Sequence, residues 1–176
     1  AMLAEVGVLC SDAHLSEVEP RHPVGDPTEG ALLVFAEKLA VDPDRLRATW
    51  SRADLVPFSS EEQCMRVRCV DGGGSRVAVK GAVERVLQLC DRQLAADGVT
   101  VALDRDRVLD VAEQMAGRGL RVLAAAHRAE PGRRDDDTAG SLIDEKNLVL
   151  VGLFAMHDPP RPAARRRSAP PPPRWP

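Results

Sequence analysis

Glu29, Phe58, Lys80 and Arg121 are the residues of this sequence whose type and context could serve chemistry. Phe58 stands between a proline and two serines, directly before an expected strand. A ring in such a place either caps the edge of a core or offers its face to a planar ligand such as a nucleobase. The local sequence leaves both roles open.

Lys80 ends an apolar stretch and is followed by Gly81 and Ala82, in a chain that uses arginine almost to the exclusion of lysine. A compact ammonium suits a phosphate or a nucleotide edge, and glycine lets the backbone approach a ligand closely. The next residues open a helix, whose N-terminus attracts anions. Alternatively, Lys80 extends its ammonium into solvent from the end of a strand.

Glu29 and Arg121 each have an ordinary explanation beside a functional one. Glu29 falls three residues after Asp26, at the capping-box position of a helix that Asp26 and Pro27 would begin. Arg121 begins an expected strand after a glycine-rich turn, where it serves either as a surface residue or as a ligand contact.

No complete catalytic or metal-binding set accompanies these residues. The sequence contains no GxSxG, HExxH, GxxxxGK[ST] or GxGxxG motif, and its histidines lack the spacing of metal ligands. The cysteines show no CxxC pair, so we expect four buried thiols in a reducing compartment: Cys10, Cys64, Cys69 and Cys90.

Hydrophobic periodicity predicts the elements that position the candidates. Helices are expected in residues 1–15 with a stop at residues 11–13, in 25–40, 43–49, 82–95 and 104–119. Strands are expected in residues 64–70, 75–80, 97–103, 120–129 and 147–158, with a hairpin turn at residues 71–74. Met65, Val67 and Cys69 alternate with two arginines, which predicts a half-buried strand. The pattern indicates an α+β fold, with a mainly antiparallel twisted sheet of about six strands flanked by helices.

Composition restricts the class of protein. The chain has 176 residues, 44% apolar and 29% charged, with a net charge of -3, which indicates one soluble domain and argues against a nucleic-acid binder. No apolar run reaches the ~18 residues of a membrane span, and no signal peptide is recognisable. We expect a polar surface loop at residues 131–140 and a Pro/Arg-rich disordered tail at residues 163–176, which could also serve as a proline-rich ligand.

The order of five blocks resembles one family: GDPTEGALL, VPFSSEEQCM, VAVKGAVERVL, GLRVLAAAHR and VGLFAMHDPPRP. These are similar to successive signatures of the nucleotide-binding domain of P-type cation-transporting ATPases, in the calcium-pump-like and sodium/potassium-pump-like branch. LCSDA also resembles the first helix of that domain. The resemblance covers residues 1–162, which would form the nucleotide-binding domain.

The resemblance implies a role for each candidate. Phe58 would stack on adenine, and Glu29 would reach the adenine amino group. Lys80 would line the inner end of the base pocket, where Gly81 and Ala82 would give close backbone approach.

The resemblance also implies the remaining walls of the pocket. Met65 and Leu123 would supply apolar walls, and Arg121 would face the polyphosphate. One position departs from the family, which usually has a lysine five residues after the stacking phenylalanine, where this chain has Gln63. With Glu61 and Glu62 adding negative charge beside it, we expect weak nucleotide affinity.

The function implied is to bind ATP, as Mg-ATP, and to position it for phosphoryl transfer to an aspartate on a separate phosphorylation domain. The phosphorylated aspartate of a DKTGT motif is absent, so we expect no catalytic or metal-binding residue in this chain and no turnover by the chain alone. The implied partners are the phosphorylation and actuator domains of a pump, on the cytoplasmic side of the cell membrane, without direct membrane or nucleic-acid contact. The alternative is a non-catalytic interaction module of the same fold with a degraded pocket.

Overall fold

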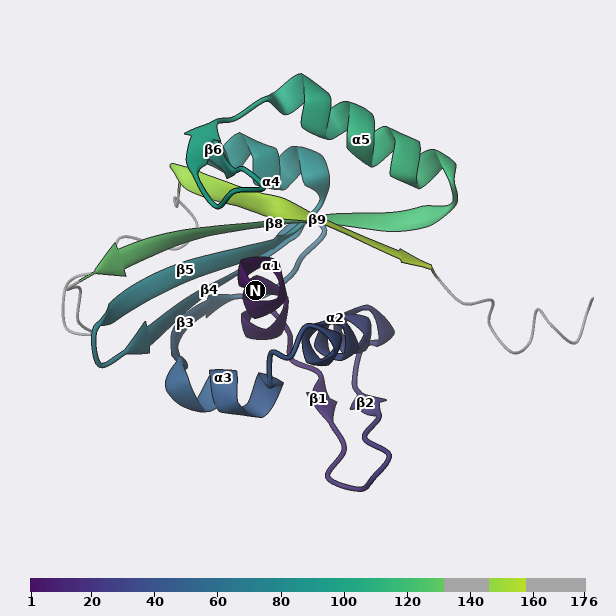
Figure 1. The fold of residues 1–176 in the computed structure, drawn as a ribbon, viewed down its shortest axis with the longest axis vertical. Helices are drawn as coiled ribbons and strands as arrows, with labels where there is room; N and C mark the ends of the chain where they lie inside the picture. Colours follow the sequence, from purple (N-terminus) through teal and green to yellow (C-terminus); the bar gives the residue numbers. More distant parts are fainter. Residues whose placement is uncertain (132–145, 158–176) are drawn as a thin grey trace, which may run out of the picture.

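The computed structural model describes residues 1–131 and 146–157, which form three layers (Figure 1). A seven-stranded sheet in the order β3-β4-β5-β8-β9-β6-β7 makes the middle layer. All neighbouring strands are antiparallel except β6 and β9. The strands are β3 (Ser51–Val56), β4 (Cys64–Asp71), β5 (Gly74–Gly81), β6 (Cys90–Leu94), β7 (Thr100–Ala102), β8 (Leu120–Pro131) and β9 (Leu148–His157). The predicted α+β class is confirmed, with seven strands rather than about six.

Helices cover both faces of this sheet. On one face lie α1 (Met2–Leu9), α2 (Pro27–Lys38) and α3 (Pro43–Thr49), and on the other lie α4 (Val83–Leu89) and α5 (Arg105–Gly117). Successive side chains of β5 point to opposite faces of the sheet: Val77 and Val79 pack toward α4, whereas Ala78 packs with α1. The two-residue period of a strand therefore gives one hydrophobic cluster on each face of the sheet, and a third cluster lies between α1 and α2.

The starts of two helices confirm the sequence prediction. Asp26 Oδ1 accepts hydrogen bonds from the backbone N–H of Thr28 at 2.8 Å and of Glu29 at 3.1 Å, with Pro27 at the first helical position. Asp42 caps α3 in the same way. Each cap satisfies N–H groups that have no partner within the helix, and so fixes where α2 and α3 begin.

Three elements differ from the prediction. The helix expected at residues 82–95 ends at Leu89, and Cys90–Leu94 forms β6 instead, because it pairs with β7 on one side and β9 on the other. Residues 51–56 form β3 on the edge of the sheet beside β4, which the sequence did not predict. His14–Leu15, at the end of the stretch where the first helix was expected, forms β1 instead and pairs with β2 (Pro23–Val24).

The prediction that residues 64–70 form a half-buried strand is wrong, because both faces of β4 are covered. Arg66 is 0% exposed and Arg68 is 4% exposed. Each arginine pairs with a carboxylate from elsewhere in the chain, Glu62 at 2.6 Å and Glu130 at 3.0 Å respectively. The expected loop at residues 131–140, apart from its first residue, and the expected tail at residues 163–176 lie outside the described residues.

Candidate functional site

A cavity of about 580 Å³ opens between the N-terminus of α2, the turn after β3 and the ends of β4, β5 and β8. It brings together seven of the nine residues that the sequence singled out. These are Glu29, Phe58, Met65, Lys80, Gly81, Arg121 and Leu123. The other lining residues are Asp12, Ala13, Gly25, Asp26, Thr28 and Pro57. Residues up to 111 positions apart in the sequence thus share one cavity.

Phe58 offers its ring to this cavity rather than to the core. It follows β3, is 63% exposed, and belongs to none of the three hydrophobic clusters that the described residues form. Met65, which is 2% exposed, and Leu123 supply apolar surface to the same cavity. An exposed ring beside an apolar wall can hold a flat, aromatic ligand by its faces.

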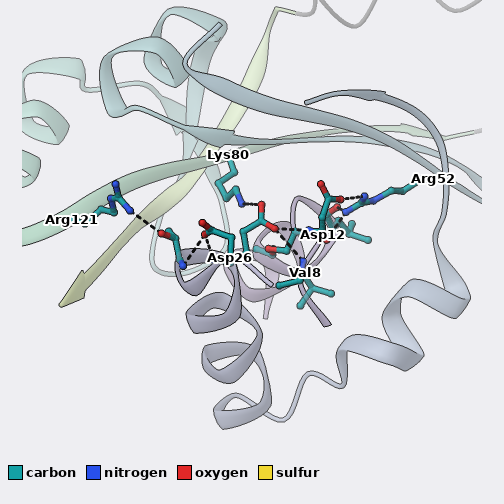
Figure 2. Close-up of polar contacts among 12 residues, drawn as sticks. Val8, Asp12, Asp26, Arg52, Lys80 and Arg121 are labelled. Atoms are coloured by element: carbon teal, nitrogen blue, oxygen red, sulfur yellow. Dashed lines mark hydrogen bonds and ion pairs between the residues drawn. The ribbon is translucent and has the colours of Figure 1, made fainter. Parts of the chain in front are cut away.

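Lys80 lies buried against the cavity and is paired. Its side chain is 8% exposed, and Nζ lies 2.9 Å from Oε1 of Glu29, whose side chain is 17% exposed (Figure 2). The ammonium therefore does not extend from the strand end into solvent, which overturns the alternative left open by the sequence. A buried lysine and a partly buried glutamate side by side give this end of the cavity a hydrogen-bond donor and an acceptor.

The Glu29 carboxylate is turned away from its own helix start. Oε2 accepts hydrogen bonds from the backbone N–H of Asp12 at 2.6 Å and of Ala13 at 3.2 Å, in the segment that follows α1. The side chain thus joins that segment to β5 through Lys80. The capping-box interpretation is therefore half correct: Asp26 caps α2, but the Glu29 carboxylate bonds to these other partners.

Arg121 lies at the rim of the cavity, since it is both exposed and among the lining residues. Its exposed side chain extends from β8, and Nη1 donates to Oγ1 of Thr28 at 2.9 Å (Figure 2). The backbone N–H of Thr28 in turn donates to the Asp26 carboxylate. A guanidinium with most of its donors free to face solvent is suited to an anion at the mouth of the cavity.

Sequence reasoning missed the residues that brace the segment after α1. Arg47 and Arg52 both donate to the carbonyl oxygen of Ser11, at 2.6 Å each, and Arg52 also pairs with the Asp12 carboxylate (Figure 2). These guanidinium groups satisfy carbonyls at the end of α1 and hold the backbone whose N–H groups meet Glu29. No local pattern marks Arg52, because its partners lie about 40 positions away.

The glycine at position 81 is required by the neighbouring strand. A Cβ there would lie 2.4 Å from the Cβ of Cys64 and 2.4 Å from the carbonyl oxygen of Gln63. Ala82 donates its N–H to that same carbonyl at 2.9 Å. Gly81 lines the cavity, whereas Ala82 and Gln63 are not among its lining residues.

Glu61 and Glu62 were expected to add negative charge beside Gln63, but the charge of Glu62 is largely compensated. The Glu62 carboxylate pairs with Arg66 at 2.6 Å and with Arg85 at 3.1 Å. Hydrogen bonds from these two guanidinium groups lower the pKa of Glu62, which keeps it ionised. The expectation that Glu62 adds free negative charge near the cavity is therefore corrected.

Residues 1–131 and 146–157 offer neither a cluster of metal ligands nor a membrane-spanning helix. These residues contain no group of three or more His, Cys, Asp or Glu side chains that could hold a metal ion. Their helices are all too short or too polar to cross a lipid bilayer. Burial raises the pKa of the Cys10 thiol to about 12, although nearby Lys80 opposes this, so Cys10 does not supply a thiolate to the cavity.

Known proteins resemble this chain over most of its length. Residues 1–163 match the family model described as P-type ATPase, cytoplasmic domain N. The chain is 48% identical over 145 residues to a probable cation-transporting ATPase F of Mycobacterium tuberculosis, which covers 80% of the chain and 15% of that protein. It is 40% identical over 159 residues to a cation-transporting ATPase of Synechocystis, covering 90% of the chain and 17% of that protein.

A calcium-transporting ATPase of Listeria monocytogenes is 30% identical over 164 residues, covering 92% of the chain and 18% of that protein. The chain thus spans less than a fifth of the length of these curated relatives. The family match, by contrast, extends over nearly all of the chain and every described residue. The chain therefore belongs to the family of P-type ATPase cytoplasmic N domains.

Proposed function

We propose that this domain binds ATP in the cavity beside Phe58 and positions it for phosphoryl transfer to an aspartate on a separate phosphorylation domain. The observation that carries the proposal is the arrangement of one cavity of about 580 Å³. It has an exposed ring at one wall, a buried lysine paired with a partly buried glutamate at its inner end, and an arginine at its rim.

The lining residues fit the parts of a nucleotide. The ring of Phe58 and the apolar side chains of Met65 and Leu123 can enclose a base and exclude water from its faces. Lys80 and Glu29 offer a donor and an acceptor to the edge of a base, and these two groups are what a purine edge requires. Arg121 carries positive charge toward the mouth, where an anionic polyphosphate would leave the cavity.

In this proposal the domain contributes binding and orientation, and another domain contributes the reacting carboxylate. Bound Mg²⁺ would neutralise charge on the phosphates. Phe58 and the apolar wall fix the base, Lys80 and Glu29 fix its rotation, and Arg121 directs the phosphate chain outward. Holding a reactant in one geometry lowers the entropic part of the barrier, so binding here would serve transfer elsewhere.

The relatives support a wider setting for the proposal. Proteins named cation-transporting and calcium-transporting ATPases contain a segment similar to this one. We infer that the domain works with the phosphorylation and actuator domains of such a cation pump, on the cytoplasmic side of the cell membrane.

Titration with ATP tests the proposal. We expect saturable amide chemical-shift changes near Phe58, Lys80 and Gly81, and a Phe58→Ala variant weakened by about 1–3 kcal/mol, the contribution of one stacked base. Leu39→Ala is the matched control, because Leu39 is also an exposed apolar residue (48%) but does not line the cavity. No shift at millimolar ATP would refute nucleotide binding and favour the alternative, an interaction module whose pocket, with Gln63 in place of lysine, no longer binds nucleotide.

A further inference from the structure

Ion pairs tie the turn that carries Phe58 (residues 57–63, the Phe58 turn) to the rest of the domain. Glu62, within this turn, pairs with Arg66 of β4 at 2.6 Å and with Arg85 of α4 at 3.1 Å. Arg85 Nε also donates to the carbonyl oxygen of Glu62 at 3.2 Å. One residue of the turn is therefore tied to both a strand and a helix.

Hydrogen bonds within the turn connect Glu62 to the residue next to the ring. The N–H of Glu62 donates to Oγ of Ser59 at 3.0 Å, and the N–H of Gln63 donates to the carbonyl oxygen of Ser59 at 2.8 Å. Gln63 also accepts from the N–H of Ala82 at 2.9 Å. Because Ser59 follows Phe58 directly, a displacement of Glu62 would also move the backbone that determines the orientation of the Phe58 ring.

The burial of Arg66 makes its pairing with Glu62 consequential. Arg66 is 0% exposed, and within the described residues its Nε and Nη1 have no hydrogen-bond partner. A buried guanidinium without its carboxylate carries a large desolvation cost, so the ion pair holds Glu62 in place. Phe58 itself is 63% exposed and has little packing of its own to hold it.

We propose that Glu62 is a positioning residue, which through Arg66 and Arg85 holds the Phe58 turn so that the ring stays beside the cavity. The inference rests on the proposed function, because a fixed ring matters for affinity only if a base stacks on it. If a side chain and its loop are ordered before binding, the entropic cost of ordering them is not paid when the ligand binds. Glu62 would then raise affinity without touching the nucleotide.

Fluorine NMR can observe the ring directly, because the chain contains only three phenylalanines. After labelling with 4-fluorophenylalanine, the Phe58 signal is the one lost in Phe58→Ala. Phe35 and Phe154 serve as internal references, since they contact each other edge to face in the core, with centroids 5.8 Å apart. In Glu62→Gln we expect the Phe58 signal to shift or broaden, the other two to stay, and ATP to bind roughly three- to tenfold more weakly.

Glu61→Gln is the matched control, because it removes the same charge from the neighbouring exposed residue, for which no ion pair is found within the described residues. This variant should leave the Phe58 signal at its parental position and should not weaken ATP binding. An equal effect of Glu61→Gln would show that charge, and not position, matters, and would overturn the inference. A change in all three fluorine signals of Glu62→Gln would also overturn it, because it would indicate a general structural role.

Arg85→Gln keeps the test decisive if Glu62→Gln does not fold, since it removes one ion pair and leaves Arg66 paired. We expect the Phe58 signal to move in the same direction by a smaller amount. If the parent chain binds ATP but neither variant changes the Phe58 signal or the affinity, the positioning role is refuted. If the parent chain does not bind ATP, the proposed function fails first, and the role of Glu62 in affinity fails with it.

Discussion

The ion pair between Lys80 and Glu29 should couple the stability of the domain to the geometry of its cavity. Nζ and Oε1 are 2.9 Å apart, and the two side chains are only 8% and 17% exposed. Removing one member of a buried pair leaves the other charge without its partner, which typically costs about 3–5 kcal/mol. In Lys80→Met the loss should be smaller, about 2–3 kcal/mol, because Glu29 keeps its bonds to two backbone N–H groups.

A double-mutant cycle measures this coupling. Urea titration gives the free energy of unfolding of four proteins: the parent, Lys80→Met, Glu29→Gln and the double variant. The comparison is valid where the m-values are the same in all four. We expect the double variant to be less destabilised than the sum of the single variants, by about 1–3 kcal/mol. Lys38→Met is the control, because Lys38 is exposed on α2, and it should change stability by no more than about 0.5 kcal/mol.

An additive cycle would refute the reasoning. If the coupling energy is below about 0.5 kcal/mol, the pair contributes no more than a surface ion pair does. The same four variants can be titrated with ATP, which separates a structural role of the pair from a role in binding. A variant that keeps parental stability but binds ATP more weakly would assign the lost group to the ligand.

Three further predictions concern stability and reactivity. Gly81→Ala should destabilise the domain by about 2 kcal/mol or more in urea unfolding, because its Cβ would lie 2.4 Å from Cys64 and Gln63, whereas Gly117→Ala, with nothing within 4 Å, should have little effect. Hydrogen bonds from Arg66 and Arg85 lower the pKa of Glu62 in the folded domain. Ionised Glu62 therefore stabilises the domain fully above the pKa that Glu62 has in the unfolded chain, and this stabilisation is lost as the pH falls through its pKa in the folded domain. The free energy of unfolding should therefore decline below about pH 5, less steeply in Glu62→Gln, and an equal slope would contradict this. All four cysteines are buried and free, and burial raises the pKa of Cys10 to about 12, so a thiol reagent at pH 8 should label them only in denaturant.

Features set by neighbouring residues could be predicted from the sequence. Asp26 followed by proline marks the start of α2, and the glycines after Asp71 mark the turn between β4 and β5. Each of these signals acts within a few positions of the chain. The same holds for the cavity residues in β5, where Lys80 and Gly81 stand together.

Features set by distant partners could not be predicted in this way. Residues 90–94 are polar enough to suit an exposed helix, and only pairing with β7 and β9 makes them a strand. The sequence around Arg66 suited a solvated strand face, but packing against distant parts of the chain leaves this residue 0% exposed. The Glu29 carboxylate was assigned to its own helix start, but backbone N–H groups 16 and 17 positions earlier compete for it.

The central place of β9 determines how the nascent chain can fold. β9 is the last strand described, yet it lies between β8 and β6, so the β6–β7 pair joins the rest of the sheet only through it. The β4–β5 hairpin closes over a short stretch of chain and can form early during synthesis, whereas the join between β6 and β9 spans more than 50 positions. Until residues 148–157 emerge from the ribosome, β8 presents an unpaired edge and the core beneath α4 and α5 stays open. We therefore expect the seven-stranded sheet to be completed only once this strand is available.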